Sequence, residues 1–302
     1  MLQACNMGEK GRSINRSVLA RGAANHMKSN AYTPVNEATS DVIKRWYQKL
    51  PFPEKYKDEF EQALLEIPIS HEISIDTYDI QESDGKRNLL SYLYLCEELK
   101  ESYEKKGISE KVILDTLEDI VLWTDTWSGV KNELYLGELG WLKRHMTMQL
   151  FRLGRLQFCM GVSEHDIPSL HVAAGDKVLE IHIPSSGDFS EKACQESIER
   201  AKEFFAAYYP GFEYKCFTCH SWLLDPTLQD LLKPESNILK FQNRFELIEK
   251  EKSDAVLRYV FQWDTTRENL QQFVCTSGLA KKVKDHVLAG NDFYEVFGAI
   301  EK

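Results

Sequence analysis

The spacing of apolar residues changes near residue 151, and this change constrains the fold more than any other feature of the chain. From about residue 41 to 151, apolar side chains recur every three or four positions, as they do in amphipathic helices. Beyond that point, short alternating runs enclose one long helical stretch. The order predicts an α+β protein with a helical N-terminal domain, 27–150, and a mixed-sheet α/β domain, 151–302.

The first half of this pattern predicts helices that pack against one another. Apolar stripes mark the stretches 88–105 and 109–127, and Gly107 separates them. Three tryptophans, Trp123, Trp127 and Trp141, also recur at helical spacing. Such a stripe is more typical of a core than of a stack of ligand-binding aromatics. We find no catalytic constellation in this half.

The second half predicts a strand–helix–strand unit. The expected strands are 155–162, 177–183 and 214–223, and the expected helix, 190–209, begins at the capping residue Ser190. A right-handed crossover places 177–183 beside 214–223 in parallel. Because ligands of such sheets bind near the carboxyl ends of parallel strands, this end of the unit is the place to look for a site.

The remainder of the second half predicts a short helix, a hairpin and a last helix. Asp225 precedes a proline, as an acidic cap does at a helix start. The runs 241–247 and 257–263 alternate apolar with polar residues, which predicts two paired strands. A final helical stretch is expected over 268–289, broken at Gly278.

Charge and hydropathy exclude two classes of partner. The net charge of −10 argues against nucleic acid, which needs a basic face. No apolar run approaches the roughly 18 residues of a membrane span. One phosphorylated small molecule remains possible, because a helix N-terminus binds phosphate without any basic residue.

Residues 1–26 differ from the rest of the chain. They are basic, rich in glycine and serine, and have no apolar period. A weak transit peptide is one interpretation. A disordered leader, or an over-long gene start with Met27 as the true beginning, is favoured because no amphipathic face is present.

The seven cysteines predict reduced thiols in a cytoplasmic protein, because no secretory signal precedes them. Cys216, Cys219 and His220 have the spacing of a c-type haem attachment site. Residues three apart on a strand point to opposite faces, however. We therefore expect neither haem nor a disulfide between these two cysteines, and no metal.

A loop between the second strand and the helix forms a candidate anion site. It contains Ser185, Ser186, Gly187 and Asp188, and it ends at the capping residue Ser190. Free backbone amides and the helix dipole attract anions at such a place. A plain connection is the competing interpretation, since the loop has one glycine and an aspartate that repels phosphate.

Three residues near the strand ends have the chemistry of a general base site. Glu180 and His182 share one strand face, and His220 lies near the end of the next parallel strand. A carboxylate and an imidazole in this arrangement suit proton abstraction from an amine. The alternatives are a surface-facing alternation or a core histidine bonded to the backbone.

Four runs of sequence resemble a known family. They are Phe151-Arg-Leu-Gly-Arg-Leu-Gln-Phe158, Glu180-Ile-His-Ile-Pro184, Cys219-His-Ser-Trp-Leu-Leu-Asp-Pro226 and Ser236-Asn-Ile-Leu-Lys-Phe-Gln242. Together with the tail 289–298, they look like the GNAT-like C-terminal domain of bacterial acyltransferases, which follows a helical N-acyltransferase domain. The resemblance covers nearly everything after Met27. Catalytic GNAT enzymes carry an Arg/Gln-x-x-Gly-x-Gly/Ala loop for coenzyme A, and the loop at Ser185 departs from it.

The resemblance implies an acyl-CoA-dependent N-acyltransferase acting on a small amine. Acyl-CoA or acetyl-CoA would then bind at the loop, with the thioester carbonyl held by backbone N–H near Ile183. Glu180 or His182 would be the base, and His220 would orient the substrate or protonate the thiolate. Further residues of the matching runs are expected to contact substrate or to be structural: Ser221, Asp225, Ser236, Asn237 and Gln242. The alternative is a non-catalytic GNAT-like module that binds a metabolite or a protein partner.

Overall fold

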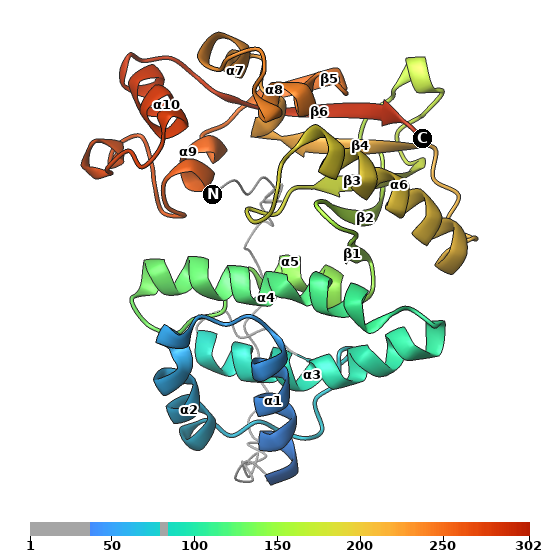
Figure 1. Ribbon diagram of the computed structural model, residues 1–302, viewed down its shortest axis with the longest axis vertical. Helices are drawn as coiled ribbons and strands as arrows, with labels where there is room; N and C mark the ends of the chain where they lie inside the picture. The colour runs from blue at the N-terminus through green and yellow to red at the C-terminus, as the bar shows by residue number, and fades with distance from the viewer. Residues whose placement is uncertain (1–36, 79–83) are drawn as a thin grey trace, which may run out of the picture.

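The computed structural model describes residues 37–78 and 84–302, and it has a helical part joined to a part built on one sheet (Figure 1). The expected leader, 1–26, and Met27 lie outside the described residues. The helices of the first part are α1 (Glu37–Lys49), α2 (Lys57–Glu66), α3 (Gly85–Lys106), α4 (Glu110–Lys131) and α5 (Leu139–Met146), with a 3-10 turn, η1 (Glu54–Tyr56), before α2. Within the described ranges no helix is both long enough and apolar enough to cross a membrane.

The second part contains six strands in the spatial order β1-β2-β3-β4-β6-β5. Their bounds are β1 (Leu150–Arg152), β2 (Gln157–Val162), β3 (Lys177–His182), β4 (Cys216–Ser221), β5 (Glu246–Lys252) and β6 (Tyr294–Glu301). Only β3 and β4 are parallel, and every other neighbouring pair is antiparallel. The expected mixed sheet with one strand–helix–strand unit is therefore confirmed.

The crossover helix of that unit is α6 (Glu191–Tyr208), and Ser190 caps it by accepting the amide of Ala193. The shorter helices of this part are α7 (Thr227–Leu231), α8 (Asn237–Gln242), α9 (Ala255–Val260) and α10 (Gly278–Leu288). Three 3-10 turns accompany them: η2 (Pro168–Leu170), η3 (Trp222–Leu224) and η4 (Leu270–Gln272). Figure 1 shows α6 lying across the sheet.

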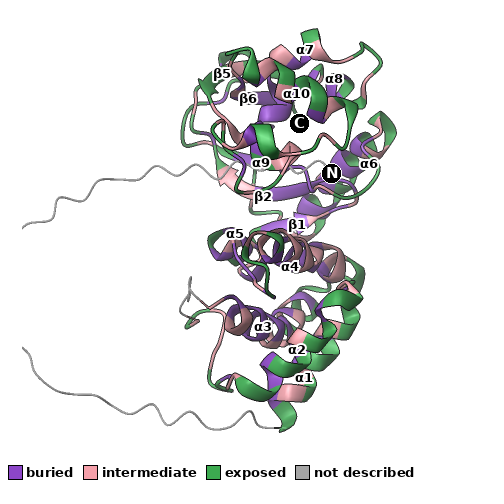
Figure 2. Cartoon of the chain, turned by 90° about the vertical axis from the view of Figure 1, so that its left-hand side faces the viewer, coloured by how far each residue is buried: buried purple, intermediate pink, exposed green. Residues whose placement is uncertain are grey.

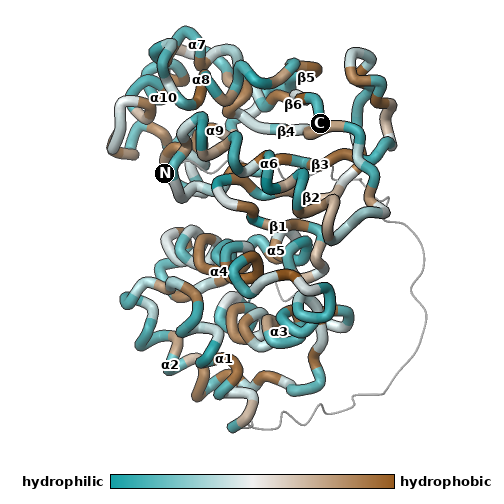
Figure 3. Tube along the Cα trace, turned by 45° about the vertical axis from the view of Figure 1, so that its right-hand side comes forward, coloured by the Kyte–Doolittle hydropathy of each residue, from teal (hydrophilic) through white to brown (hydrophobic). Residues whose placement is uncertain are grey.

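One continuous hydrophobic core joins the two parts. It runs from Ile43 in α1 to Val296 in β6, and α4 packs directly against β1. Buried residues follow α3 and the strands, whereas α1 and α2 have exposed outer sides (Figure 2). Hydrophobic residues likewise gather along β1, β2 and β3 and on the inward sides of α3 and α4 (Figure 3). Trp123 and Trp141 are core residues, as expected.

The predicted hairpin between 241–247 and 257–263 is wrong. The first run contains the end of α8, which Ser236 begins by accepting the amide of Ile238, and the second run overlaps α9. The strand between them, β5, is almost entirely charged and exposed. Because β5 is an edge strand, it needs no apolar face and leaves no alternating signal.

The partner of β5 is β6, which alternation did not reveal. β6 lies between β4 and β5 and is buried through five consecutive residues. Continuous burial on both faces removes the period of two. The last helix, α10, begins at Gly278, where a break was expected, but the residues before it form η4 and a loop instead of a helix.

Candidate active site

One face of the sheet gathers the polar residues that the sequence singled out. On β3, Glu180 and His182 point to the face opposite Leu179 and Ile181, which belong to the main core. The register pairs Glu180 with Thr218, so that His182 and His220 come next along β3 and β4 on the same face. The two predicted histidines thus follow each other across the parallel pair.

Glu180 lies between two positively charged or protonatable groups. Its Oε2 is 3.2 Å from Arg144 Nη1 and 3.4 Å from His182 Nε2. Burial favours the protonated acid, but the close approach of His182 and the charge of Arg144 together lower the pKa of Glu180 below its ordinary value. The carboxylate is therefore ionised at neutral pH. It remains open to a ligand, because 30% of its side chain is exposed.

The helical part supplies the wall of this site. Trp141 of α5 meets the His182 ring edge to face, with centroids 4.7 Å apart. Its indole Nε1 donates to Asp119 of α4 at 3.0 Å, and the same carboxylate oxygen lies 2.9 Å from His145 Nε2. Asp119, Trp141 and His145 are all buried. This network fixes α5 against α4 and so places Trp141 and Arg144 over the sheet.

Sequence reasoning missed Arg144 because it comes from the other domain. The guanidinium packs over the Trp141 ring at 5.4 Å and approaches Cys159 Sγ at 3.7 Å as well as Glu180. The sequence around Arg144 shows only the apolar spacing of a helix, and no local motif identifies Arg144 as a site residue. Long-range contacts between domains are not visible in a periodic pattern.

Cys159, Glu180 and His182 also have the donor chemistry of a metal site. One ligand atom of each lies within 4.8 Å of the others. Arg144 Nη1, however, already contacts both the thiol and the carboxylate. The Arg144 guanidinium in this position supplies the positive charge that a metal ion would bring. The geometry therefore favours the arginine side chain over a metal ion as the partner of these groups.

His220 has a different environment from His182. Its Nε2 lies 3.7 Å from Glu251 Oε1 on β5, and its ring lies 6.3 Å from that of Phe297. Burial lowers the pKa of His220 and outweighs the nearby glutamates, which raise it. His220 is therefore mainly neutral at pH 7, and it can accept or donate one hydrogen bond without carrying charge.

The loop before α6 is shaped by its aspartate. Asp188 accepts the backbone amide of Ser190 at 3.0 Å and its hydroxyl at 2.6 Å. Asp188 is therefore part of the helix start. Ser185 and Ser186 precede the turn at Gly187, whose φ of +100° is in the region that favours glycine.

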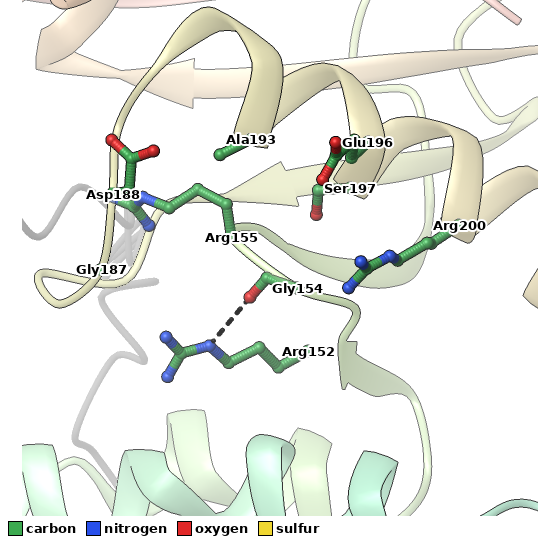
Figure 4. Close-up of a pocket in the computed structure, with 9 residues that line it drawn as sticks. All are labelled: Arg152, Gly154, Arg155, Gly187, Asp188, Ala193, Glu196, Ser197 and Arg200. Carbon is green, nitrogen blue, oxygen red and sulfur yellow. Dashed lines mark hydrogen bonds between the residues drawn. The ribbon is translucent and has the colours of Figure 1, made fainter.

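Three arginines surround this loop, and sequence reasoning missed all of them. Arg152 is the last residue of β1, Arg155 lies in the turn between β1 and β2, and Arg200 comes from α6 (Figure 4). With Gly187 and Asp188 they line a hollow of about 260 Å³. Arg152 and Arg155 lie within the run 151–158 that carries the family resemblance, so that run held the only signal for them.

Ser221, Asp225 and Gln242 form structural bonds. Ser221 Oγ accepts the amide of Leu223 at 3.0 Å. Asp225 is fully buried and accepts the amides of Thr227 and Tyr294. Gln242 Nε2 donates to the carbonyls of Leu223 and Asp225. These bonds tie η3, α7 and α8 to β6, and they leave little capacity for a substrate.

Ser236 and Asn237 have separate roles. Ser236 Oγ accepts the amide of Ile238 at 3.3 Å and begins α8. Asn237 lines a second hollow, of about 520 Å³, on the start of α6 with Lys192, Lys240 and Arg244. Of the five residues expected to be structural or substrate-binding, Asn237 is thus the one at a hollow.

Cys216 and Cys219 point to opposite faces of β4, because Cys216 belongs to a small cluster under β6 and Cys219 to the main core. All six cysteines in the described ranges are free thiols. The expectation of no disulfide between Cys216 and Cys219 is therefore confirmed.

Comparisons with known proteins divide the chain between the helical part and the part built on the sheet. Residues 37–148 match the family described as the N-acyltransferase N-terminal domain, and residues 150–300 match the GNAT-like C-terminal domain. No curated protein matches the chain.

The solved structures include acyltransferases of the same fold. One, an acyltransferase in complex with decanoyl-CoA and teicoplanin, is 19% identical with a TM-score of 0.67, over 88% of this chain and 96% of that one. Another, in complex with CoA and 10C-teicoplanin, is 20% identical with a TM-score of 0.68, over 89% of this chain and 88% of that one. At this identity the likeness describes the fold.

Proposed function

Because the chain belongs to the acyltransferases that join an N-acyltransferase N-terminal domain to a GNAT-like C-terminal domain, we propose that it transfers an acyl group from acyl-CoA to an amine. The observation that carries this proposal is the position of Glu180. It is an ionised, partly open carboxylate at the end of the parallel pair, and it is held between His182 and Arg144.

The donor enters where β3 and β4 part. The register between these strands contains two pairs, after which β3 leads into the loop before α6 and β4 into η3. The acyl thioester lies at this opening, with its carbonyl held by backbone N–H near Ile183. Ser185, Ser186, Gly187 and Ser190 then lie toward the phosphates, at the positive end of the α6 dipole.

Glu180 acts as the base on the acceptor amine. The amine nitrogen attacks the thioester carbon while Glu180 takes its proton, directly or through one water. The C–N bond forms, the C–S bond breaks, and the leaving thiolate takes up a proton. His182, on the same face of β3, supports the carboxylate from 3.4 Å away. His220, which is mainly neutral, suits the orienting role better than that of a proton donor.

The test is acyl transfer by the purified chain, measured as thiol release from acetyl-, octanoyl- and decanoyl-CoA. The acceptors are small primary amines and an amine-bearing glycopeptide, since one structural neighbour holds teicoplanin. Glu180→Gln lowers the rate by about a hundredfold or more at unchanged stability. Glu199→Gln, on the exposed side of α6, is the matched control. Equal rates for the two variants would remove Glu180 from the mechanism.

A non-catalytic binding module is the second candidate, and one observation favours it. The loop from Ser185 to Asp188 lacks the glycine signature of GNAT enzymes, and Asp188 occupies the helix start. A chain of this kind would bind a ligand at the same opening without releasing thiol. Ligand-dependent thermal stabilisation with no turnover on any acceptor would favour this second function.

A further inference from the structure

Arg155 is a buried cation without a bonding partner. Its residue is only 6% exposed, and Nε and Nη1 meet no hydrogen-bond acceptor among the described residues. Asp188 attracts its charge without forming an ion pair, and the guanidinium packs over the Phe189 ring at 4.9 Å. Burial lowers the pKa of Arg155 to about 10, so that it still carries its charge at neutral pH.

A buried and unpaired guanidinium is costly for a fold, because it loses its hydration and gains no bond in return. Proteins keep such a group where a ligand completes it. Arg155 lines the hollow beside Gly187, and neighbouring atoms cover its Nε and Nη1, so the missing partner is an acceptor that reaches them from the hollow by displacing this cover (Figure 4).

The surroundings of Arg155 select an anion as that partner. Arg152 reaches Ser186 Oγ at 3.4 Å with one nitrogen while another pairs with Glu118 at 2.7 Å. Arg200 forms no ion pair within the described part of the chain and lies 3.1 Å from where a Cβ of residue 154 would stand. Gly154, with a φ of +94°, thus leaves space for the Arg200 guanidinium.

The start of α6 adds a second attraction for negative charge. This helix has 18 residues, and Ser190 Oγ takes the amide of Ala193. The amides of Glu191 and Lys192 lie in the first turn, where no carbonyl of the helix can accept them. The start of α6 and three arginines therefore line one hollow, together with the carboxylates of Asp188 and Glu196.

We propose that Arg155, with Arg152 and Arg200, binds the phosphate groups of acyl-CoA. This inference rests on the proposed function and assigns the donor's phosphates to side chains of the β1–β2 turn and of α6. Guanidinium forks match phosphate oxygens in pairs, and so arginines take over what a glycine-rich loop does with backbone amides.

The hollow continues in the direction that such a donor needs. A third hollow, of about 350 Å³, shares Arg152, Gly154 and Arg200 with the hollow at Gly187. It extends along α6 to Phe204 and Tyr208. The aromatic rings of Phe204 and Tyr208 suit the adenine ring of the donor. With adenine placed there, the phosphates lie beside the arginines and the pantetheine arm runs toward the end of β3.

Arg155→Met tests the proposal with two effects of opposite sign. Coenzyme A affinity, measured by titration calorimetry, falls about ten- to a hundredfold, because charged hydrogen bonds to phosphate are lost. The melting temperature of the free protein rises by about 2–4 °C, because an unpaired buried charge is removed. Arg155→Lys keeps the charge, loses the fork and recovers only part of the affinity.

Arg258→Met is the matched control, since it removes the same charge from an exposed position on α9. Arg244→Met probes the hollow on the other side of α6. A lower melting temperature of Arg155→Met with unchanged coenzyme A affinity would overturn the proposal. Loss of affinity in Arg244→Met but not in Arg155→Met would do the same.

Donor analogues separate this proposal from the proposed function. An acyl-pantetheine thioester has no phosphate, so the KM for it stays the same in Arg155→Met while the KM for acyl-CoA rises. An equal rise for both donors would assign Arg155 a structural role. Inorganic pyrophosphate that binds the wild type, competes with coenzyme A and loses affinity in Arg155→Met supports the proposal even where no acceptor is turned over. If the protein binds pyrophosphate but not coenzyme A, the proposal that the arginines bind the phosphates of acyl-CoA is overturned.

Discussion

Arg144 of the helical domain lies 3.2 Å from Glu180 of the sheet, so the candidate active site is built from both domains. The contact joins the last turn of α5 to the middle of β3. It explains why a helical domain with no catalytic constellation of its own precedes a GNAT-like sheet. Arg144 acts on the reaction through Glu180, by holding the carboxylate ionised and aimed along the strand.

Arg144→Gln is expected to slow acyl transfer about tenfold or more and to change its pH dependence. The guanidinium helps to lower the pKa of Glu180, so its removal raises that pKa. The acid limb of the kcat profile then moves to higher pH, because Glu180 must be ionised to act. Arg144→Lys keeps a positive charge near Glu180, so its acid limb shifts less than that of Arg144→Gln. Lys143→Gln, exposed on the same helix, leaves the profile unchanged, and a purely structural role for Arg144 would lower activity without moving the limb.

Gly161→Ala is expected to displace Glu180 from its position. A Cβ at residue 161 would stand 2.2 Å from Glu180 Oε1, which is closer than any two such atoms can approach. The carboxylate must rotate away from Arg144, and acyl transfer falls about tenfold or more while coenzyme A affinity is retained. Gly129→Ala is the control, because nothing lies within 4 Å of its Cβ position in α4. Wild-type kinetics of Gly161→Ala would show that Glu180 is free to move without loss.

The sequence predicted the parts of the fold in which periodicity and burial agree. The crossover helix has one buried stripe and a Ser190 cap, and β3 is a short, mostly buried run that ends just before Pro184, so both were found nearly to their ends. The edge strand β5 and the fully buried strand β6 have no alternation, one because it is charged and the other because both faces are covered. Their pairing was therefore missed, and a hairpin was predicted in its place.

The candidate site was predictable only where its residues lie on neighbouring strands. Glu180, His182 and His220 follow from strand register alone. Arg144 and Arg155 depend on how α5 and the β1–β2 turn fold back onto β3, and such contacts between distant segments leave no local pattern. The bonds of Asp188 to Ser190 were not predicted, because a loop carboxylate that caps a helix looks the same in sequence as one that projects into solvent.

Ser236→Ala and Asn237→Ala are expected to separate stability from binding at adjacent positions. Ser236 caps α8, so its loss lowers the free energy of unfolding by about 1 kcal/mol without changing ligand affinity. Asn237 caps nothing and lines the hollow with Lys240 and Arg244, so its truncation changes stability by less than about 0.5 kcal/mol. Urea unfolding of both variants measures the difference. A larger stability loss for Asn237→Ala than for Ser236→Ala would contradict these assignments.

Asp119→Asn is expected to destabilise the protein at neutral pH and progressively less in acid. Burial opposes ionisation of Asp119, but the hydrogen bonds with His145 and Trp141 outweigh it and lower the pKa below its ordinary value of 3.8. The unfolded chain therefore takes up a proton before the folded one does, and the contribution of the ionised carboxylate is complete above about pH 4 and lost as the pH falls through the folded pKa. At pH 7 the loss is about 1.5–3 kcal/mol, because buried hydrogen bonds to a charged carboxylate are replaced by weaker ones to a neutral amide. Thermal unfolding of both proteins from pH 7 to pH 3 measures the gap, which narrows as the pH falls through the folded pKa. A gap that stays constant would mean that Asp119 is protonated in the native protein.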